Sequence, residues 1–246
     1  KAVGFTGSRS GGLALVRVAQ QRAEPIPVYA EMSSVNPVFV LSAALAADPA
    51  KVAADYVGSL TLGSGQFCTN PGVVLVPSGE SGDAFLAEVG IRIAAASGQT
   101  MLTSGIGDAY REGVAEREAS GATVVARGQA DTAANAPAPI VFSDAVEAFG
   151  EALEGEIFGA AGLVLRYDGT EQLREFAEQL EGQLTATVLA ADADADEARA
   201  LLPVLERKVG RILFTGWPTG VEVGYSMVHG GPYPAPSDAR STSVGA

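Results

Sequence analysis

The feature that most constrains the fold of this 246-residue chain is an alternation of short β-branched segments with longer segments of helical periodicity. The expected strands are residues 3–6, 28–31, 38–41, 73–76, 122–126, 140–142, 163–167, 186–189 and 211–214. Strands that alternate with helices usually pair in parallel, because each helix carries the chain back to the start of the next strand. The sequence therefore predicts an α/β fold with a largely parallel sheet flanked by helices.

Five amphipathic helices are expected between these strands. The first begins at Asp48, a capping residue, with Pro49 at the first helical position, and it places Val52, Tyr56 and Leu60 on one stripe. The others begin near residue 83, near residue 108, after residue 170 and within the acidic tract 192–196, whose carboxylates suit the positive end of a helix. The Ala- and Pro-rich segment 129–139 is expected to be a surface loop.

Composition excludes several classes of partner. The chain is 47% apolar, enough for a sizeable core in one large domain or two smaller ones. A net charge of −13 repels phosphate backbones, so we expect no nucleic-acid partner. No apolar stretch approaches the roughly 20 residues of a membrane span, and no secretory signal opens the chain. We therefore expect no membrane association and a cytoplasmic location.

The only cysteine, Cys68, lies among small residues between Gly63 and Pro71. A cysteine that packs as a small hydrophobe usually lies inside an apolar run, and this one does not. The residues alone leave open whether Cys68 is a reactive thiol or a packed side chain. The only histidine, His229, is either a base for Cys68 or a structural hydrogen-bonding group, and the structural role is favoured because no other partner is evident.

Four other segments carry residue types that are common in binding sites, although each also has an ordinary structural interpretation. After the first expected strand, a turn with Gly7 and Ser8 leads into a helix, and free N–H groups there suit a phosphate. Glu31 ends an expected strand, and Glu156 precedes an aromatic residue and a glycine. The only tryptophan, Trp217, lies in a loop with a proline and flanking glycines.

The order and spacing of these segments resemble the aldehyde dehydrogenase superfamily over almost the whole chain. The matching motifs are, in order, F-T-G-S before a helix, E-x-x-x-x-N-P, G-Q-x-C-T, E-I-F-G and T-G-W-P-T-G. The Ser33-Ser34 pair after Glu31 is most similar to the α-ketoglutarate semialdehyde and NADP-dependent fatty aldehyde dehydrogenase branch. The chain departs from many relatives at Gly155 and Ala160, where a glutamate and a proline are more usual.

The resemblance implies oxidation of an aldehyde to a carboxylic acid with NAD or NADP, through a cysteine thiohemiacetal and a thioester. Cys68 matches the family nucleophile, and Glu31 matches the general base that activates the hydrolytic water. Cysteine suits the first step because a thiolate is strongly nucleophilic and the side chain is appreciably ionised near neutral pH. The nicotinamide then takes the hydride.

The resemblance also implies the binding residues. The implied cofactor-binding residues are Gly7 and Ser8 at the pyrophosphate, Glu156 at the nicotinamide ribose and Phe158 beside the nicotinamide ring. The implied substrate-pocket residues are Phe67, Trp217 and Thr219. No metal site is expected.

Relatives are about twice as long, and both ends of this sequence look cut, so the resemblance implies a partial chain. Residues 1–33 would be the end of a cofactor-binding domain, 34–235 a catalytic domain, and 236–246 the start of an oligomerisation tail. A full-length protein would be a homodimer or homotetramer, and the isolated piece would not be a competent dehydrogenase. Two other functions stay open: a cofactor-independent thioesterase or acyltransferase, and a non-catalytic interaction domain. The sequence separates neither NAD from NADP nor one aldehyde from another.

Overall fold

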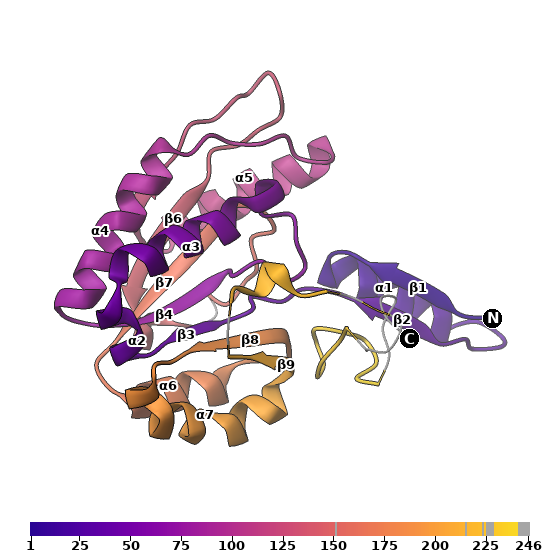
Figure 1. Cartoon of the computed structure of the whole chain (residues 1–246). Coiled ribbons are helices and arrows are strands. Elements are labelled where there is room, and N and C mark those ends of the chain that lie inside the picture. Colours follow the sequence, from indigo (N-terminus) through magenta and orange to yellow (C-terminus); the bar gives the residue numbers. More distant parts are fainter. Residues whose placement is uncertain (151, 215, 223, 225–228, 241–246) are drawn as a thin grey trace.

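The computed structural model describes residues 1–150, 152–214, 216–222, 224 and 229–240 (Figure 1). Its strands form two sheets, a two-stranded sheet β1-β2 and a seven-stranded sheet of order β5-β6-β7-β4-β3-β8-β9. Every neighbouring pair is parallel except β5 and β6, which are antiparallel. The predicted α/β fold with a largely parallel sheet is confirmed.

A small unit precedes the large sheet and lies to one side of it (Figure 1). It consists of β1 (Val3–Thr6), α1 (Arg9–Gln20) and β2 (Val28–Glu31). Ser8 caps α1, its hydroxyl accepting from the Gly11 N–H at 3.2 Å. Glycine at position 12 lets α1 pack closely on the end of β2, because a Cβ there would lie 2.6 Å from the sulfur of Met32.

The end of the described chain returns to this small unit. The Met32 N–H donates to the Ala235 carbonyl at 2.7 Å, and the Ser237 N–H donates to the Ala30 carbonyl at 2.8 Å. The Ser237 hydroxyl also donates to the Val28 carbonyl at 2.7 Å. Residues 235–237 therefore lie along the edge of β2, and this return places the preceding segment, which contains His229, beside Glu31.

The large sheet supplies most of the core. Its strands are β3 (Val38–Val40), β4 (Val73–Pro77), β5 (Thr123–Arg127), β6 (Ile140–Ala145), β7 (Ala161–Tyr167), β8 (Gln183–Leu189) and β9 (Val209–Leu213). Strand β4 is buried at every position. Burial on both faces explains why the central strands β3 and β4 are continuous apolar runs rather than alternating ones.

Helices cover both faces of the large sheet (Figure 1). They are α2 (Ser42–Ala47), α3 (Pro49–Thr61), α4 (Glu80–Ala95), α5 (Ser104–Ala119), α6 (Thr170–Gln179) and α7 (Ala195–Lys208). Residues of α3 and α4 pack on one face of the sheet, around Tyr56 and Phe85. Residues of α5, α6 and α7 pack on the other face, around Phe142 and Phe176.

Helix α3 begins where the sequence predicted, because Asp48 caps it and its carboxylate accepts a hydrogen bond from the Lys51 N–H at 2.9 Å. The six-residue helix α2 was not predicted, because it is too short to show a period. It is held from a distance: the buried Asp194 carboxylate accepts from the N–H groups of Ala43 and Ala44, each at 2.9 Å. The acidic tract thus supports a second helix start.

Candidate active site

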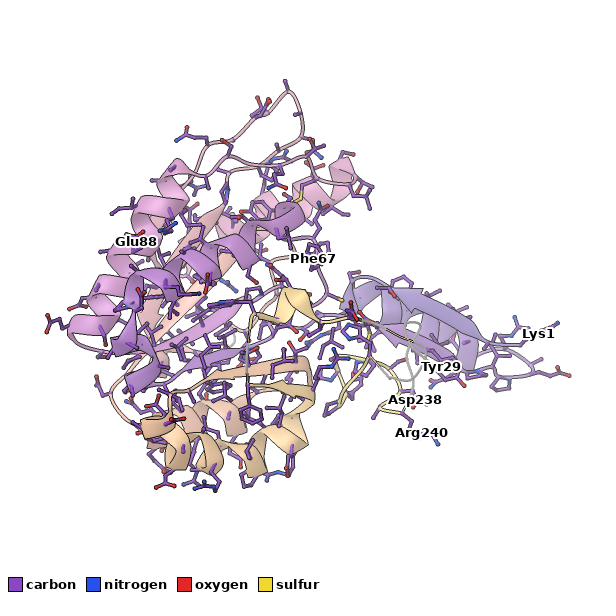
Figure 2. The ribbon with its side chains drawn as sticks, viewed as in Figure 1. Lys1, Tyr29, Phe67, Glu88, Asp238 and Arg240 are labelled. Atoms are coloured by element: carbon purple, nitrogen blue, oxygen red, sulfur yellow. The ribbon has the colours of Figure 1, made fainter. Side chains whose placement is uncertain are left out.

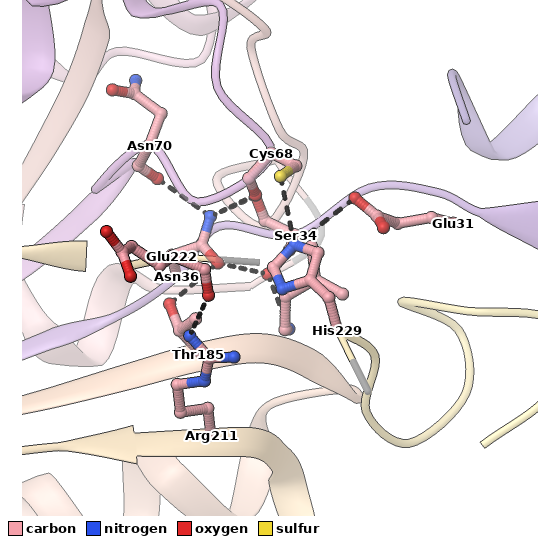
Figure 3. Close-up of polar contacts among 10 residues, drawn as sticks. Glu31, Ser34, Asn36, Cys68, Asn70, Thr185, Arg211, Glu222 and His229 are labelled. Atoms are coloured by element: carbon pink, nitrogen blue, oxygen red, sulfur yellow. Dashed lines mark hydrogen bonds and ion pairs between the residues drawn. The ribbon is translucent and has the colours of Figure 1, made fainter. Parts of the chain in front are cut away.

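Three side chains from separate segments meet between the small unit and the large sheet (Figure 3). Glu31 is the last residue of β2, Cys68 lies in the loop between α3 and β4, and His229 precedes the segment that returns along β2. The Cys68 Sγ lies 3.1 Å from the His229 Nε2, and the same nitrogen lies 3.6 Å from the Glu31 Oε1. The fold therefore brings the chain's only cysteine and only histidine into contact beside a carboxylate.

The burial of the three groups differs in a way that suits a reactive thiol. The Glu31 side chain is 1% exposed and the His229 side chain is 2% exposed, whereas Cys68 is only partly buried. Among the described residues, neither carboxylate oxygen of Glu31 has a geometric hydrogen-bond partner. Cys68 is therefore the most exposed of the three groups, and the two base candidates beside it are almost fully buried.

This environment keeps the thiol protonated. Burial, and then the negative charge of Glu31, raise the pKa of Cys68 to about 12. The expectation of appreciable ionisation near neutral pH therefore does not hold for the resting site. Burial, and then the charge of Arg211, lower the pKa of His229, so its imidazole is neutral and able to accept a proton. Burial also raises the pKa of Glu31, and contact with the Cys68 thiol offsets part of that rise.

Sequence reasoning favoured a structural hydrogen bond for His229 over a role as the base for Cys68, and the structure places the two side chains in contact. The two residues are 161 positions apart, so no local pattern joins them. The one available signal was that the chain has a single residue of each type.

The loop before Cys68 has an unusual backbone. Gly63, Ser64 and Gly65 have φ values of 55°, 62° and 68°, in the left-handed region that disfavours side chains. At Gly65 a Cβ would also fall 2.3 Å from the carbonyl carbon of Gly159. Only glycine fits there, and the left-handed turn directs the chain from α3 back toward β4, which places Cys68 at the site.

Asn36 holds this loop from beneath (Figure 3). Its Nδ2 donates to the carbonyls of Cys68 and Asn70, each at 2.9 Å. Its Oδ1 accepts from the Ser34 hydroxyl at 2.9 Å and from the Thr185 hydroxyl at 3.0 Å. Asn36 therefore ties the cysteine loop to β8, a role that the sequence motif did not reveal.

The residues proposed for the cofactor divide into two groups. Glu156 and Phe158 line a cavity with Ser34 and Asn70, and the Phe158 ring is 38% exposed. A second cavity, lined by Arg9 and Glu181, is also lined by Glu156. Burial raises the pKa of Glu156 to about 8, and a backbone hydrogen bond from Ser34 offsets part of that rise.

Gly7 and Ser8 lie at the start of α1, next to the base candidate. The Gly7 N–H donates to the carbonyl of Glu31 at 3.1 Å, so this turn and the end of β2 are joined directly. Neither residue lines the two cavities beside Glu156.

The residues proposed for the substrate pocket are placed differently. The Trp217 ring lies 5.5 Å from the Tyr56 ring, centroid to centroid, and the Thr219 hydroxyl lies 2.6 Å from the Ser59 hydroxyl. These contacts fasten the tryptophan loop to α3. Phe67 is next to Cys68 and lies on the side of the large unit that faces the small one (Figure 2). The substrate role of all three stays a prediction, and residue 215 of the tryptophan motif lies outside the described residues.

None of the helices that the structure describes has the length and apolar character of a membrane span.

The protein resembles two curated relatives over its whole length. It is 49% identical over 249 residues to alpha-ketoglutaric semialdehyde dehydrogenase 2 of Azospirillum brasilense, and 44% identical to alpha-ketoglutaric semialdehyde dehydrogenase of Acinetobacter baylyi. Each alignment covers 100% of this chain and 47% of the relative, so the chain spans about half the length of the curated relatives it matches.

A solved structure gives the same fold. Betaine aldehyde dehydrogenase of Staphylococcus aureus, a double mutant in complex with NAD+, matches 96% of this chain and 48% of its own with a TM-score of 0.79 at 17% identity. The family model described as the aldehyde dehydrogenase family matches residues 1–231. The chain therefore belongs to the aldehyde dehydrogenase family, as its motifs predicted.

Proposed function

We propose that this chain carries the catalytic site of an NAD(P)-dependent dehydrogenase that oxidises an aldehyde to a carboxylic acid, with Cys68 as the nucleophile. The observation that carries the proposal is the contact of the Cys68 Sγ with the His229 Nε2 at 3.1 Å, beside the buried carboxylate of Glu31. The overall reaction consumes an aldehyde, water and NAD(P)+ and yields an acid, NAD(P)H and a proton.

The first step needs a base because the resting thiol is protonated. The neutral imidazole of His229 accepts the thiol proton at its Nε2 as the Cys68 sulfur bonds to the aldehyde carbon. The adduct is a thiohemiacetal, whose carbon is tetrahedral. When bound, the nicotinamide ring supplies the acceptor for the hydride that leaves this carbon. Loss of that hydride leaves a thioester on Cys68.

Glu31 acts in the second step. A carboxylate whose pKa is raised toward neutrality is a better base for water than an ordinary surface glutamate. Glu31 removes a proton from a water molecule, the water oxygen attacks the thioester carbon, and the C–S bond breaks to release the acid. The thiolate of Cys68 then takes back the proton held by His229, Glu31 gives up its proton to solvent, and the resting state returns.

The described residues fit a nicotinamide cofactor. Glu156 lies between two cavities and offers a carboxylate to ribose hydroxyls, and the exposed ring of Phe158 offers an apolar face. Gly7 and Ser8 precede the positive end of α1, which suits a phosphate. Arg117 fixes the loop before Glu156, because its guanidinium donates to the carbonyls of Leu153 and Gly155 at 3.1 and 2.6 Å.

The aldehyde that we propose is an ω-oxo carboxylic acid of the α-ketoglutaric semialdehyde type. Its support is that the two relatives, which are 49% and 44% identical to this chain, are alpha-ketoglutaric semialdehyde dehydrogenases. A panel of straight-chain aldehydes with and without a terminal carboxylate tests this. A kcat/KM that is no higher for the carboxylated members would contradict it.

Two further properties stay predictions, namely assembly as a homodimer or homotetramer and a cytoplasmic location. Light scattering of the full-length protein tests the assembly.

The mechanism is tested in the full-length protein by replacing one group at a time. Cys68→Ala should abolish aldehyde-dependent NAD(P)H formation. Glu31→Gln should still release about one equivalent of NAD(P)H per site in a burst, and then turn over slowly, because only thioester hydrolysis is blocked. His229→Gln should slow the burst itself. Glu175→Gln, an exposed residue of α6, is the matched control and should behave as wild type.

Two results would contradict this assignment. Substantial turnover by Cys68→Ala would remove the nucleophile. A Glu31→Gln variant that shows neither a burst nor an accumulated acyl-enzyme would place Glu31 in the first step. Ester hydrolysis at full rate without nucleotide, together with no aldehyde oxidation, would favour the thioesterase alternative.

A further inference from the structure

The three active-site side chains form a set that matches a metal site in type and spacing. Among the described residues, Glu31, Cys68 and His229 each offer one ligand atom, and these atoms lie within 4.8 Å of one another. Thiolate sulfur, imidazole nitrogen and carboxylate oxygen are the ligands that Zn²⁺ takes in proteins. A three-ligand set leaves the fourth tetrahedral position open to water, unlike the closed four-ligand set of structural zinc sites.

The observed separations are close to those of a tetrahedral ion. With Zn–S near 2.3 Å and Zn–N near 2.0 Å, tetrahedral geometry separates sulfur from nitrogen by roughly 3.5 Å, and nitrogen from oxygen by roughly 3.4 Å. The structure gives 3.1 Å for Cys68 Sγ to His229 Nε2, and 3.6 Å for His229 Nε2 to Glu31 Oε1. These two separations are therefore within a few tenths of an ångström of the tetrahedral values, and the third pair, sulfur and carboxylate oxygen, lies within 4.8 Å.

A second observation points to a cation at this place. Both carboxylate oxygens of Glu31 are buried, and neither has a geometric hydrogen-bond partner among the described residues. A buried carboxylate without such partners is costly, and a cation is one of the groups that satisfy it. The carboxylate is directed at the His229 nitrogen that also contacts Cys68 (Figure 3).

We propose that Glu31, Cys68 and His229 bind a single Zn²⁺ ion, or another divalent ion that prefers nitrogen and sulfur ligands, and that this binding reversibly blocks the nucleophile. The metal bonds to the Cys68 sulfur, and the thiol proton leaves to solvent. The His229 Nε2 and one Glu31 oxygen complete the protein ligands, with water at the fourth position. Metal binding stands on geometry alone, whereas the blocking of aldehyde oxidation rests on the proposed function.

Co²⁺ is the direct probe, because a cobalt–thiolate bond gives a charge-transfer absorption band and tetrahedral Co²⁺ gives intense visible bands. The 246 residues contain one cysteine and one histidine, so within them each spectral feature has a single source, and the variants below assign the features in the full-length protein. Titration of the full-length protein with Co²⁺ should produce the thiolate band at one ion per chain. Added Zn²⁺ should abolish the band, and a chelator should restore the metal-free spectrum.

Near-isosteric variants identify each ligand. Cys68→Ser should lose the thiolate band, and His229→Gln and Glu31→Gln should each weaken Co²⁺ binding by about tenfold or more. Glu175→Gln should leave the titration unchanged. His229→Asn serves as a second histidine variant if the glutamine variant does not fold. In wild type, Zn²⁺ should also slow the alkylation of Cys68 by iodoacetamide.

The possible failures are distinguishable. Absence of the thiolate band at saturating Co²⁺, or an unchanged affinity in both His229→Gln and Glu31→Gln, would overturn the metal site whatever the enzyme does. A normal band in a protein that oxidises no aldehyde would leave the metal site standing and refute the proposed function.

Discussion

Replacement of Asn36 tests how the cysteine loop is held. The residue is 1% exposed, and its side chain bonds three carbonyls and two hydroxyls at 2.9 to 3.2 Å. Asn36→Ala leaves the carbonyls of Cys68 and Asn70 and the fully buried Thr185 hydroxyl without this partner. At about 1 kcal/mol or more for each orphaned group, the expected loss in free energy of unfolding is roughly 3 to 5 kcal/mol.

The backbone adds a second term that a glycine variant separates. Asn36 has a φ of 46°, a conformation that asparagine tolerates better than alanine. Asn36→Gly removes the same hydrogen bonds without the Cβ strain, so it should be about 1 kcal/mol more stable than Asn36→Ala. Asn36→Asp keeps the shape but points an oxygen at two carbonyls, and it should be at least as unstable as Asn36→Ala.

Denaturant unfolding followed by circular dichroism measures these differences, and the iodoacetamide labelling rate of Cys68 reports whether the loop has moved. We expect the order wild type, Asn36→Gly, Asn36→Ala in stability, and altered labelling in both variants. An Asn36→Ala protein within 1 kcal/mol of wild type, with unchanged labelling, would refute the view that this side chain holds the loop.

Two further predictions concern the backbone and the pH dependence. Gly65→Ala should lower the free energy of unfolding by more than about 3 kcal/mol, because its Cβ would meet the backbone of Gly159 at a positive φ. Gly58→Ala should be neutral or stabilising, because there is open space around this position of α3. Equal effects of the two substitutions in thermal or denaturant unfolding would contradict this prediction. Because the pKa of Glu156 is raised from 4.5 to about 8, the native state binds more protons than the unfolded state in that window, so this residue's contribution to stability is lost as pH rises from about 5 to 8. The denaturant midpoint of Glu156→Gln should fall less steeply with pH than that of wild type, and parallel curves would show that the shift is absent.

The local elements and the family could be predicted from the order of the residues alone. Period and capping predicted α3, because an Asp–Pro start and a 3.6-residue stripe act within one helix. The strands were predicted because buried parallel strands are apolar runs. Their ends differ by a few residues, as at β7, which begins at Ala161 rather than at residue 163. The five motifs identified the family because they occur along the chain in the family's order. The match to the aldehyde dehydrogenase family then confirmed this identification.

The groups that surround the Cys68 thiol could be found only from the tertiary structure. The contact of Cys68 with His229 depends on residues 235–237 pairing with the edge of β2, a long-range hydrogen-bond pattern that no local sequence signal encodes. The roles of Asn36 in holding the loop and of Asp194 in starting α2 likewise join segments more than 30 residues apart. The protonation state of the Cys68 thiol also depends on tertiary structure, because burial and the neighbouring Glu31 carboxylate raise its pKa.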